Sequence, residues 1–370
     1  MSHLSEDTYW MRRALKLARR AKGQTSPNPC VGAVIVKDGQ LVAEAYHHGA
    51  GMPHAEALAL QQAGERARSA TLYVTLEPCC HYGRTPPCTD AIIRARIKRV
   101  VIPFTDPNPL VRGRSVQILR DAGIEVTMGV LEEDAQQLIE DFTKFITTHT
   151  PFVTLKLATS LDGKIATRTG DSKWITSERA QRIAHRLRRE HTAVMVGINT
   201  VLIDDPELTA RYGRVERQPT RIVVDSTARL PINSRLCQTA ERAPIWLATT
   251  RRAPLQCKQR LQRAGVRVLT VKARDGKVDL KALMRRLARE EIMSVLIEGG
   301  GEIAWSALDA GIVDKVVWFI APIIIGGRKA HHSVAGEGIA YLRDAFQLER
   351  VSIKRIGSDI MLVGYVKCKR

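Results

Sequence analysis

Four side chains suited to metal binding or proton transfer lie within 35 residues of one another. An imidazole, His54, is followed two residues later by the carboxylate of Glu56, and the thiols of Cys79 and Cys88 come after them. Three nitrogen and sulfur ligands with a fourth position open are typical of a catalytic zinc site. Zinc lowers the pKa of a bound water to about 7, so hydroxide is available at neutral pH. Glu56, a non-ligand, is predicted to carry protons from that water to a leaving amine.

The residues around these side chains predict the elements that position them. Pro53 and His54 follow a turn and open a run with helical apolar spacing, so His54 and Glu56 are expected in the first turn of a helix. Cys79 follows a predicted buried strand at 71–76, and Cys88 is expected to begin the next helix. Cys80 points to the opposite side of an extended chain, so it is left out of the predicted metal site.

The order His-x-Glu, Pro-Cys and a later Cys resembles the signature of the cytidine deaminase-like zinc deaminases. Members that act on nucleosides and nucleic acids usually have Cys-x-x-Cys, whereas eight residues separate Cys79 from Cys88 here. The segment resembles the deaminase half of the bifunctional riboflavin-pathway deaminase-reductase family. A buried histidine with two unrelated cysteines is the alternative, and the combined pattern makes that alternative the weaker one.

Several loops are expected to frame a deaminase pocket. Asn28 lies between two prolines, which fix its backbone and could direct its amide to a pyrimidine edge; an ordinary turn residue is the alternative. The family resemblance favours binding by Asn28, and it makes the turn at 106–109 (Asp-Pro-Asn-Pro) similar to the substrate-side loop. Arg84, inside the long loop between the two cysteines, is a candidate contact for a ribose phosphate.

Length and composition favour two globular domains. A chain of 370 residues is too long for one typical core, and 44% hydrophobic residues are enough for two cores. No run of 18 apolar residues predicts a membrane span, and the N-terminal residues do not resemble a signal peptide. Four cysteines, Cys30, Cys237, Cys257 and Cys368, are scattered along the chain and fit free thiols in a reducing compartment. We therefore expect a cytoplasmic protein without membrane contact.

The net charge of +19 is unevenly distributed. Residues 1–150 contain 18 Lys and Arg against 16 Asp and Glu, whereas the remainder contains 39 against 22. A deaminase that acts on RNA should have its basic surface around its own active site. The excess instead lies in the second half, where small phosphorylated ligands explain it. We therefore expect no nucleic-acid partner.

Strand and helix signals divide the chain into residues 1–147, a predicted three-layer α/β/α domain, and residues 148–370, a predicted second α/β domain. The first domain is expected to contain a helix at 5–22, a hairpin of strands at 31–36 and 41–46, and a final helix at 131–147. The second is expected to contain a helix at 178–190 and strands at 152–158, 193–197, 221–225, 245–249, 266–271 and 294–298. Antiparallel strands are expected at 313–321, 348–354 and 360–367.

A glycine cluster, Gly299-Gly300-Gly301, lies between the last of these buried strands and a predicted helix. Free backbone N–H groups at such a turn can bind a phosphate, although a plain strand-to-helix turn is an equal alternative. Together with Lys156, the 160–163 turn, Trp174 and the 204–206 segment, the cluster resembles the riboflavin-pathway reductase. That reductase has a dihydrofolate-reductase-like fold and uses NADPH, so the resemblance covers essentially the whole chain.

The resemblance implies two sets of contact residues in the second domain. For any single Asp or Arg among them surface charge is the favoured alternative, and the combined motif reverses that preference. The implied cofactor contacts are Ala158, Trp174, Thr200, Asp204, Ser226, Gly300, Gly301, Glu302, Ile303, Ala304, Trp305 and Ser306. The implied substrate contacts are Lys156, Ser172, Arg188, Leu208, Arg211 and Glu298. Within them, Ser172, Arg188 and Arg211 suit a phosphate group, and Asp204 or Glu298 could orient or protonate the group that accepts hydride.

The resemblance implies two successive reactions. The first is the zinc-dependent deamination of 2,5-diamino-6-(5-phosphoribosylamino)pyrimidin-4-one, and the second is the NADPH-dependent reduction of the phosphoribosyl group of the aminouracil product to the ribityl form. It also implies a homo-oligomer, a dimer or a tetramer. The rival hypotheses are an RNA-binding deaminase, suggested by the total charge, and an enzyme with one degenerate half.

Overall fold

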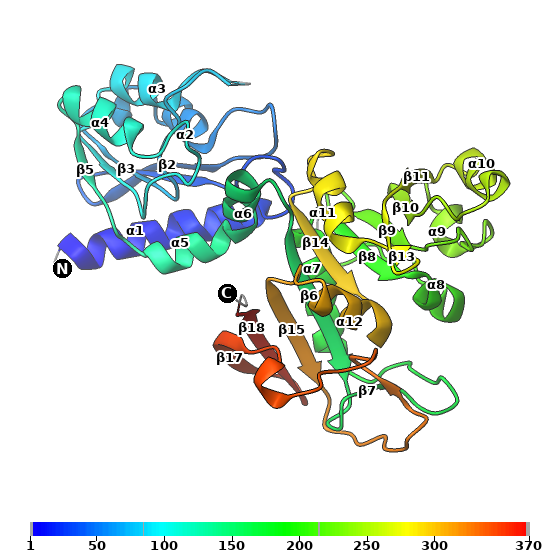
Figure 1. The fold of residues 1–370 in the computed structure, drawn as a ribbon. Coiled ribbons are helices and arrows are strands. Elements are labelled where there is room, and N and C mark those ends of the chain that lie inside the picture. Colours follow the sequence, from blue (N-terminus) through cyan, green and yellow to red (C-terminus); the bar gives the residue numbers. More distant parts are fainter. Residues whose placement is uncertain (1–2, 84, 214, 368–370) are drawn as a thin grey trace. The chain divides into compact units, whose positions relative to one another are not determined.

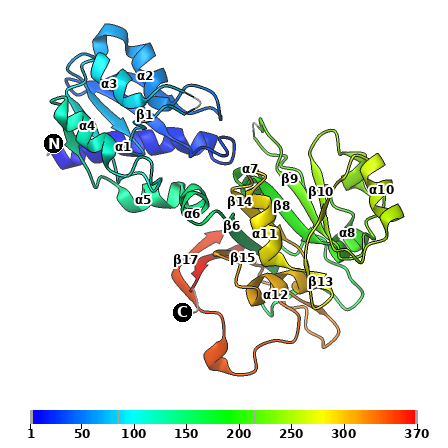
Figure 2. The ribbon, with the colours of Figure 1, turned by 45° about the horizontal axis from the view of Figure 1, so that its top comes forward.

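The computed structural model describes residues 3–83, 85–213 and 215–367, so the predictions for Arg84 and Cys368 lie outside the described residues. The chain divides into two compact units between His149 and Thr150, and Figures 1 and 2 show their elements. None of the helices in the described part of the chain combines the length and the apolar character that crossing a bilayer requires.

The first unit is built on a five-stranded sheet. Its strands, in spatial order, are β2 (Gln40–Tyr46), β1 (Gly32–Lys37), β3 (Thr71–Val74), β4 (Arg99–Val101) and β5 (Glu125–Thr127). Strand β1 pairs antiparallel with β2 and β3, and β3, β4 and β5 are parallel. Because the parallel strands need crossover connections, helices lie on the faces of this sheet.

The sheet of the first unit is covered by α1 (His3–Ala18), α2 (Ala55–Ala63), α3 (Cys88–Arg94) and α4 (Arg114–Asp121), with short 3-10 turns η1 (Arg19–Ala21) and η2 (Gly64–Ala67). Two further helices follow, α5 (Glu132–Leu138), which packs against α1, and α6 (Glu140–Thr148). One core cluster joins buried residues of α2, α3 and α4 to one sheet face, for example Ala59 and Ile92 against Leu72. Helix α1 packs on the other face, so closely that a Cβ at Gly32 would lie 2.2 Å from the Ala14 carbonyl oxygen. The predicted three-layer α/β/α domain is confirmed.

Three sequence predictions for the first unit differ from the structure. The helix expected at 131–147 is two helices, α5 and α6, because Ile139 leaves helical geometry with φ −113° and ψ 25°. The first helix ends at Ala18 and continues only as the η1 turn. His54 is the N-cap of α2 with extended backbone angles, so it precedes the first turn in which it was expected.

The second unit is built on a nine-stranded sheet. In spatial order its strands are β11 (Arg267–Thr270), β10 (Ile245–Thr249), β9 (Thr220–Val224), β8 (Ala193–Gly197), β14 (Ser294–Glu298), β6 (Phe152–Thr159), β15 (Lys315–Ile320), β18 (Asp359–Val366) and β17 (Leu348–Ile356). The strands from β11 to β15 are parallel, and β18 and β17 add an antiparallel edge. Each strand predicted from the sequence is present within about two residues of its expected position.

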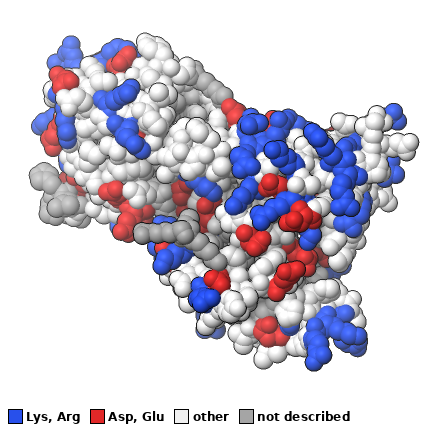
Figure 3. Space-filling model, viewed as in Figure 1, with Lys and Arg blue, Asp and Glu red and all other residues white. Residues whose placement is uncertain are grey.

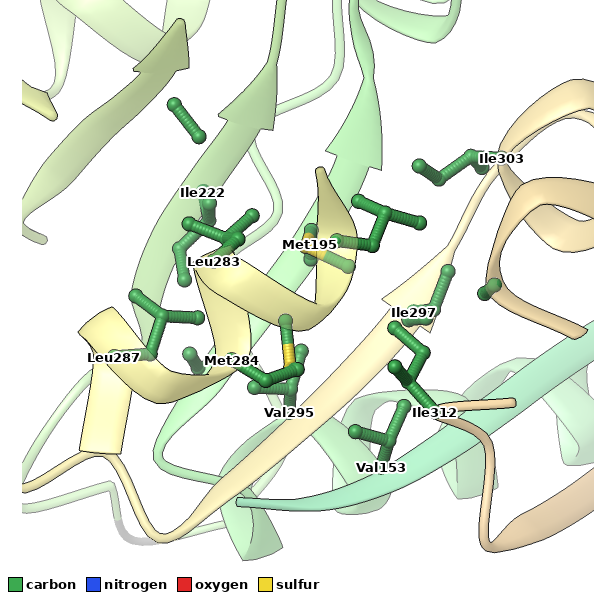
Figure 4. Close-up of a cluster of buried hydrophobic side chains, with 14 of the residues drawn as sticks. Val153, Met195, Ile222, Leu283, Met284, Leu287, Val295, Ile297, Ile303 and Ile312 are labelled. Carbon is green, nitrogen blue, oxygen red and sulfur yellow. The ribbon is translucent and has the colours of Figure 1, made fainter. Parts of the chain in front are cut away.

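Both faces of this sheet are buried by helices: α7 (Glu178–Glu190), α8 (Ile198–Asp204), α9 (Arg235–Gln238), α10 (Leu255–Arg263), α11 (Leu280–Ala288) and α12 (Gly301–Asp309). Alternate residues of one strand enter different cores, since Met195 packs in the cluster with α11 and α12 and Val194 in the cluster with α8 and α10. Figure 4 shows the first cluster, in which Leu283 and Met284 of α11 cover Ile222, Met195 and Val295. Such continuous burial explains the near-continuous apolar strands.

Two small sheets and a short 3-10 turn were not predicted from the sequence. Strand β7 (Lys164–Ala166) pairs with β16 (His331–His332), and β12 (Ala273–Arg274) pairs with β13 (Lys277–Val278). The η3 turn (Leu342–Asp344) precedes β17. Strands of two or three residues have no readable alternation, so their pairing depends on tertiary contacts.

Candidate metal centre and cofactor cavity

The imidazole of His54 and the thiols of Cys79 and Cys88 converge in the first unit. One ligand atom from each lies within 4.8 Å of the others, and this is the only such group of metal-binding side chains among the residues that the structure describes. His54 Nδ1 lies 3.5 Å from Cys79 Sγ and 3.4 Å from Cys88 Sγ. The two sulfurs and the nitrogen therefore face one point, as three ligands of a tetrahedral zinc ion must.

Local structure holds each of these three donors in place. His54 lies at the start of α2, where its other ring nitrogen, Nε2, is 3.2 Å from Thr85 Oγ1. Cys88 begins α3, and its backbone N–H donates to Cys79 Sγ at 3.4 Å. A hydrogen bond on the second ring nitrogen fixes the orientation of a ligating histidine, so Thr85 supports His54 Nδ1 as the nitrogen that faces a metal.

The thiols have the electronic character of metal ligands. A hydrogen bond with Cys88 lowers the pKa of Cys79 to about 4, and His54 contributes in the same direction. The same hydrogen bond raises the pKa of Cys88. This environment favours the thiolate form of Cys79, which is the form that binds zinc, and a bound cation would favour the thiolate of Cys88 too. The donor set fits zinc.

Glu56 is buried in the first turn of α2, beside these ligands. Burial is the main cause that raises the pKa of Glu56 to about 6, and the negative charge of Cys79 adds to it. A carboxyl group with a pKa near neutrality can both accept and release a proton. Glu56 thus has the position and the acidity that a proton carrier needs.

Asn28 is connected to His54 by a second histidine, His47, which the sequence analysis missed. Its amide nitrogen, Nδ2, is 3.0 Å from His47 Nε2, and His47 Nδ1 is 3.1 Å from the carbonyl oxygen of Pro53. Burial lowers the pKa of His47, so a neutral ring that donates from Nδ1 accepts from Asn28. The His47 ring also contacts the His54 ring edge-on, with centroids 5.2 Å apart. The pair of adjacent histidines, His47 and His48, is the only signal in the sequence that could have indicated His47.

The 106–109 turn is folded against the segment that carries Cys79. Asp106 is buried and accepts from the Asn108 N–H at 2.7 Å, while Glu77 accepts from the Asp106 N–H at 2.9 Å. Burial raises the pKa of Asp106 to about 7, with the negative charges of Glu77 and Cys79 adding to it. The turn therefore lies near enough to Cys79 for the negative charge of that thiolate to raise the pKa of Asp106.

A cavity of about 780 Å³ lies at the carboxyl ends of the parallel strands in the second unit. This is the edge at which open α/β sheets bind ligands. Fourteen of the predicted contact residues line it: Lys156, Ala158, Ser172, Arg188, Thr200, Asp204, Leu208, Ser226, Glu298, Gly300, Gly301, Glu302, Ile303 and Ser306.

A buried ion pair forms one wall of this cavity. Arg188 donates to both oxygens of Glu298, at 2.7 Å and 2.8 Å, and Lys156 Nζ lies 3.8 Å from Glu298. Lys156 and Glu298 are register partners on β6 and β14, which places them side by side. Burial alone would raise the pKa of Glu298, but the charges of Arg188 and Lys156 outweigh it and lower the pKa to about 2. Burial lowers the pKa of Lys156.

The predicted glycine turn borders the cavity and needs its glycines. Gly299 has φ +154°, and a Cβ there would lie 2.9 Å from Thr200 Oγ1. A Cβ at Gly301 would lie 2.4 Å from the His332 carbonyl oxygen. The N–H of Gly300 donates to Thr200 Oγ1 at 3.2 Å, and α12 begins at Gly301 with its N-terminus at the cavity. The N-terminus of a helix therefore faces the cavity, although the Gly300 N–H is bound to Thr200.

The second acidic candidate, Asp204, lies at the end of α8. Its side chain accepts a long hydrogen bond from Ser172 Oγ at 3.5 Å, and burial raises its pKa. Unlike Glu298, it has no ion-pair partner among the contacts of the described residues. The two carboxyl groups therefore differ in their surroundings.

Four predicted contact residues lie outside the lining of this cavity. Ala304 is fully buried in the core, and Trp305 packs edge-on against Phe346, with centroids 6.2 Å apart. Arg211 is exposed beside Glu207, at 3.8 Å. Trp174 is 77% exposed with φ +69° and lines a smaller cavity of about 410 Å³.

The far end of the large cavity is basic, which the sequence analysis missed. Arg229 and Lys277 line it together with Ser226, and the N–H of Val278 donates to Ser226 Oγ at 3.1 Å. Asp225, at the end of β9, is buried and accepts from the N–H of Leu230 at 3.1 Å and from Arg229 Nε at 3.5 Å. The carboxylate oxygens of Asp225 are therefore occupied by hydrogen bonds from the loop that follows it. On the face seen in Figure 3, Lys and Arg gather over the second unit, as its charge predicts.

Comparison with known families assigns each unit separately. Residues 4–103 match the model of the cytidine and deoxycytidylate deaminase zinc-binding region, and residues 151–362 match the model of the RibD C-terminal domain. The second match alone covers more than half of the chain.

Whole-chain relatives have the same two-part organisation. The chain is 48% identical to the riboflavin biosynthesis protein RibD of Aquifex aeolicus, over 96% of this chain and 97% of that protein. It is 42% identical to RibD of Escherichia coli, over 96% and 98%. A crystal structure of a diaminohydroxyphosphoribosylaminopyrimidine deaminase/5-amino-6-(5-phosphoribosylamino)uracil reductase from Thermotoga maritima superposes with a TM-score of 0.86, at 37% identity over 99% of this chain and 100% of that chain.

Proposed function

The chain belongs to the family of bifunctional riboflavin biosynthesis proteins, which join a deaminase and a reductase, and within that family we propose which substrates, cofactor and side chains serve each reaction. The first unit is the deaminase unit and the second is the reductase unit. The proposed substrate of the first is 2,5-diamino-6-(5-phosphoribosylamino)pyrimidin-4-one, and the product passes to the second for reduction of its phosphoribosyl group.

In the deaminase unit, His54, Cys79 and Cys88 would hold zinc, which when bound supplies a Lewis acid that activates water at neutral pH. Glu56 takes a proton from the attacking water and returns it to the leaving nitrogen, so that a C–O bond forms, a C–N bond breaks and ammonia leaves. Asn28, oriented by His47, contacts the pyrimidine edge. The 106–109 turn closes the substrate side.

In the reductase unit, Ser172, Arg188 and Arg211 are proposed to bind the substrate phosphate, and Leu208 to contact the substrate. Arg188 has N–H groups beyond those bound to Glu298 and Thr209, so it can serve a phosphate while the ion pair persists. Glu298 is ionised and fully paired, which makes it a poor proton donor. Lys156, with its pKa lowered by burial, is the better donor to the ring-opened ribose as C1′ accepts hydride.

The proposed hydride donor is NADPH rather than NADH. In dinucleotide sites, a free carboxylate at a strand end binds the ribose 2′-OH of NADH, whereas a nearby Arg accommodates the 2′-phosphate of NADPH. Here the carboxylate of Asp225 is occupied by its own loop, and Arg229 and Lys277 line that end of the cavity. The remaining proposed cofactor contacts are Ala158, Trp174, Thr200, Asp204 and the turn from Gly300 to Ser306. The side chains of Trp174, Ala304 and Trp305 do not line the cavity, so these three residues would have to move or to contact the cofactor through their backbone atoms.

The single observation that carries the proposal is the convergence of His54, Cys79 and Cys88 beside buried Glu56 in a chain whose other unit matches the reductase family. Incubation with the diaminopyrimidine, followed by mass analysis, tests it. Without NADPH we expect ammonia and the aminouracil; with NADPH we expect the ribitylamino product. Tight, salt-sensitive tRNA binding without either product would support the RNA-binding rival instead.

Substitution at the basic end of the cavity tests the choice of cofactor. The Arg229→Ala/Lys277→Ala double variant should raise KM for NADPH by roughly tenfold or more while KM for NADH changes little, because only the former has the 2′-phosphate. Arg274→Ala, on the same small sheet but outside the cavity lining, is the matched control. Equal effects on both cofactors would contradict the assignment.

Family membership also supports a cytoplasmic homo-oligomer, a dimer or a tetramer. Light scattering of the purified protein and cell fractionation would test these two points, and a monodisperse monomer would contradict the first.

A further inference from the structure

A buried carboxylate that takes no part in the proposed chemistry lies two residues before a metal ligand. Glu77 is 3% exposed, and its oxygens accept four backbone hydrogen bonds. Oε2 accepts from Asp106 N at 2.9 Å and Gly113 N at 2.8 Å, and Oε1 accepts from Ser115 N at 3.1 Å and Val116 N at 3.4 Å. An ionised carboxylate offers about four lone-pair sites, so this side chain is fully used.

These four bonds join one side chain to a whole segment. Asp106 and Gly113 are the two ends of the 106–113 loop, and Ser115 and Val116 are in the first turn of α4 (Figure 1). Gly113, the N-cap residue of α4, has no side chain to cap that helix. Glu77 therefore supplies the cap from elsewhere in the chain and fixes both ends of the loop at once.

On its other side, Glu77 is connected to the metal ligands by a short, stiff segment. Pro78 fixes its own backbone φ between Glu77 and Cys79. The carbonyl oxygen of Cys79 accepts from Thr89 N at 3.2 Å, and its sulfur accepts from Cys88 N at 3.4 Å. The ligand segment is thus held to α3 independently of Glu77, while the 106–113 loop is held to the ligand segment by Glu77.

We propose that Glu77 is a positioning residue for deamination, which sets the place of the 106–113 loop relative to the metal ligands and thereby the affinity for the pyrimidine substrate. The inference rests on the proposed function of the deaminase unit, in which that loop closes the substrate side. It requires that loss of Glu77 act on KM and leave the metal bound, because the three ligands keep their own hydrogen bonds.

Glu77→Gln tests this with Asp7→Asn as the matched control. Asp7 is also a buried carboxylate of the deaminase unit, and it accepts from Tyr73 OH at 2.9 Å and from Arg99 at 2.9 Å and 2.7 Å, both residues outside the segment from Glu77 to Cys88. Each variant replaces one of the two acceptor oxygens by an amide NH₂ group that cannot accept, so both should lower the melting temperature.

Only Glu77→Gln should change substrate binding. We expect its KM for the diaminopyrimidine to rise between about tenfold and a hundredfold, because small displacements of substrate-positioning groups have effects of that size. Its zinc content should equal that of the wild type and its reductase activity should be unchanged. Glu77→Asp has a shorter side chain that can accept only some of the four hydrogen bonds, so it should show an intermediate KM. It replaces Glu77→Gln in the experiment if that variant does not fold.

The proposal is overturned if KM is unchanged in a folded Glu77 variant, if Asp7→Asn raises KM equally, or if zinc is lost, because Glu77 would then act on the fold or on the ligands. These outcomes differ from failure of the proposed function, in which the wild-type protein would release no ammonia from the pyrimidine.

Discussion

The metal centre and the cofactor cavity are assembled in different ways. The three candidate ligands and the proposed proton carrier of the metal centre come from 35 consecutive residues. His54, Glu56 and Cys88 lie at the start of a helix, and Cys79 lies in the loop between β3 and α3. The cavity instead gathers side chains from Lys156 to Ala335, from the ends of several parallel strands. The first site is encoded locally, and the second exists only once the whole sheet has formed.

The two sites also handle charge differently. The metal centre is a cluster of side chains suited to bind a cation. The cavity instead contains Arg188 and Lys156 beside the buried Glu298, and Arg229 and Lys277 at its far end. One site is suited to bind a cation and the other to bind anionic ligands, so a substitution in one should leave the activity of the other unchanged.

Removal of the sulfur ligands should have the largest effect. The Cys79→Ser/Cys88→Ser variant should contain almost no zinc, where the wild type contains about one ion per chain, and it should release no measurable ammonia. Reductase activity on supplied aminouracil should remain. Metal analysis with both assays checks this, and Cys257→Ser, away from the cluster, is the control. Loss of both activities would mean that the sites are not independent.

Glu56→Ala should come next. Zinc should stay bound, but ammonia release should fall by roughly 10²–10⁴-fold, the usual contribution of a positioned acid or base. The reductase rate should be unaltered. Glu65→Ala, an exposed carboxylate just after the same helix, should retain full activity. A folded Glu56→Ala protein that deaminates normally would remove Glu56 from the mechanism.

Arg188→Ala should destabilise the reductase unit. It leaves Glu298 buried without its bidentate partner, a change that costs roughly 3–5 kcal/mol of unfolding free energy. Four of the five tryptophans lie in this unit, so fluorescence in urea measures it. Arg182→Ala, on the same helix but in an exposed pair with Glu178 at 2.8 Å, should change little. Similar losses for both variants would argue against a buried pair.

The smallest expected effect is a pH dependence in the reductase unit. Burial and the charges of Arg188 and Arg211 lower the pKa of His185 from 6.5 to about 4, although Glu298 and the Thr209 carbonyl oppose them. Between these values the unfolded chain binds a proton that the folded chain does not, so stability falls as pH drops from 6.5 to 4.

His185→Gln should therefore lose less stability than the wild type between pH 7 and pH 5, as judged by urea midpoints. His331→Gln, an exposed histidine of the same unit, should follow the wild type. Parallel curves for wild type and His185→Gln would show that His185 titrates normally in the folded chain.

Most of the fold could be predicted because its elements have strong local signals. The strands at 193–197, 245–249 and 294–298 are continuous apolar runs, and α7 begins at the N-cap Ser177 as its pattern indicates. Where the signal is ambiguous, prediction failed: Ile139 interrupts a segment whose polar and apolar residues are compatible with one long helix. Strands of two residues, such as β16, have no pattern to recognise.

The sequence by itself determined the chemistry of the deaminase unit, because His54, Glu56, Cys79 and Cys88 have side-chain types and spacings that few other sites share, and short helices and turns suffice to bring them together. Only the tertiary structure decided which charges meet. The pairing of Arg188 with Glu298, the four amides around Glu77 and the basic end formed by Arg229 and Lys277 join residues 29 to 110 positions apart, whose proximity depends on sheet order and register. Long-range contacts of this kind are set by packing of the whole sheet and leave no periodic trace in the chain.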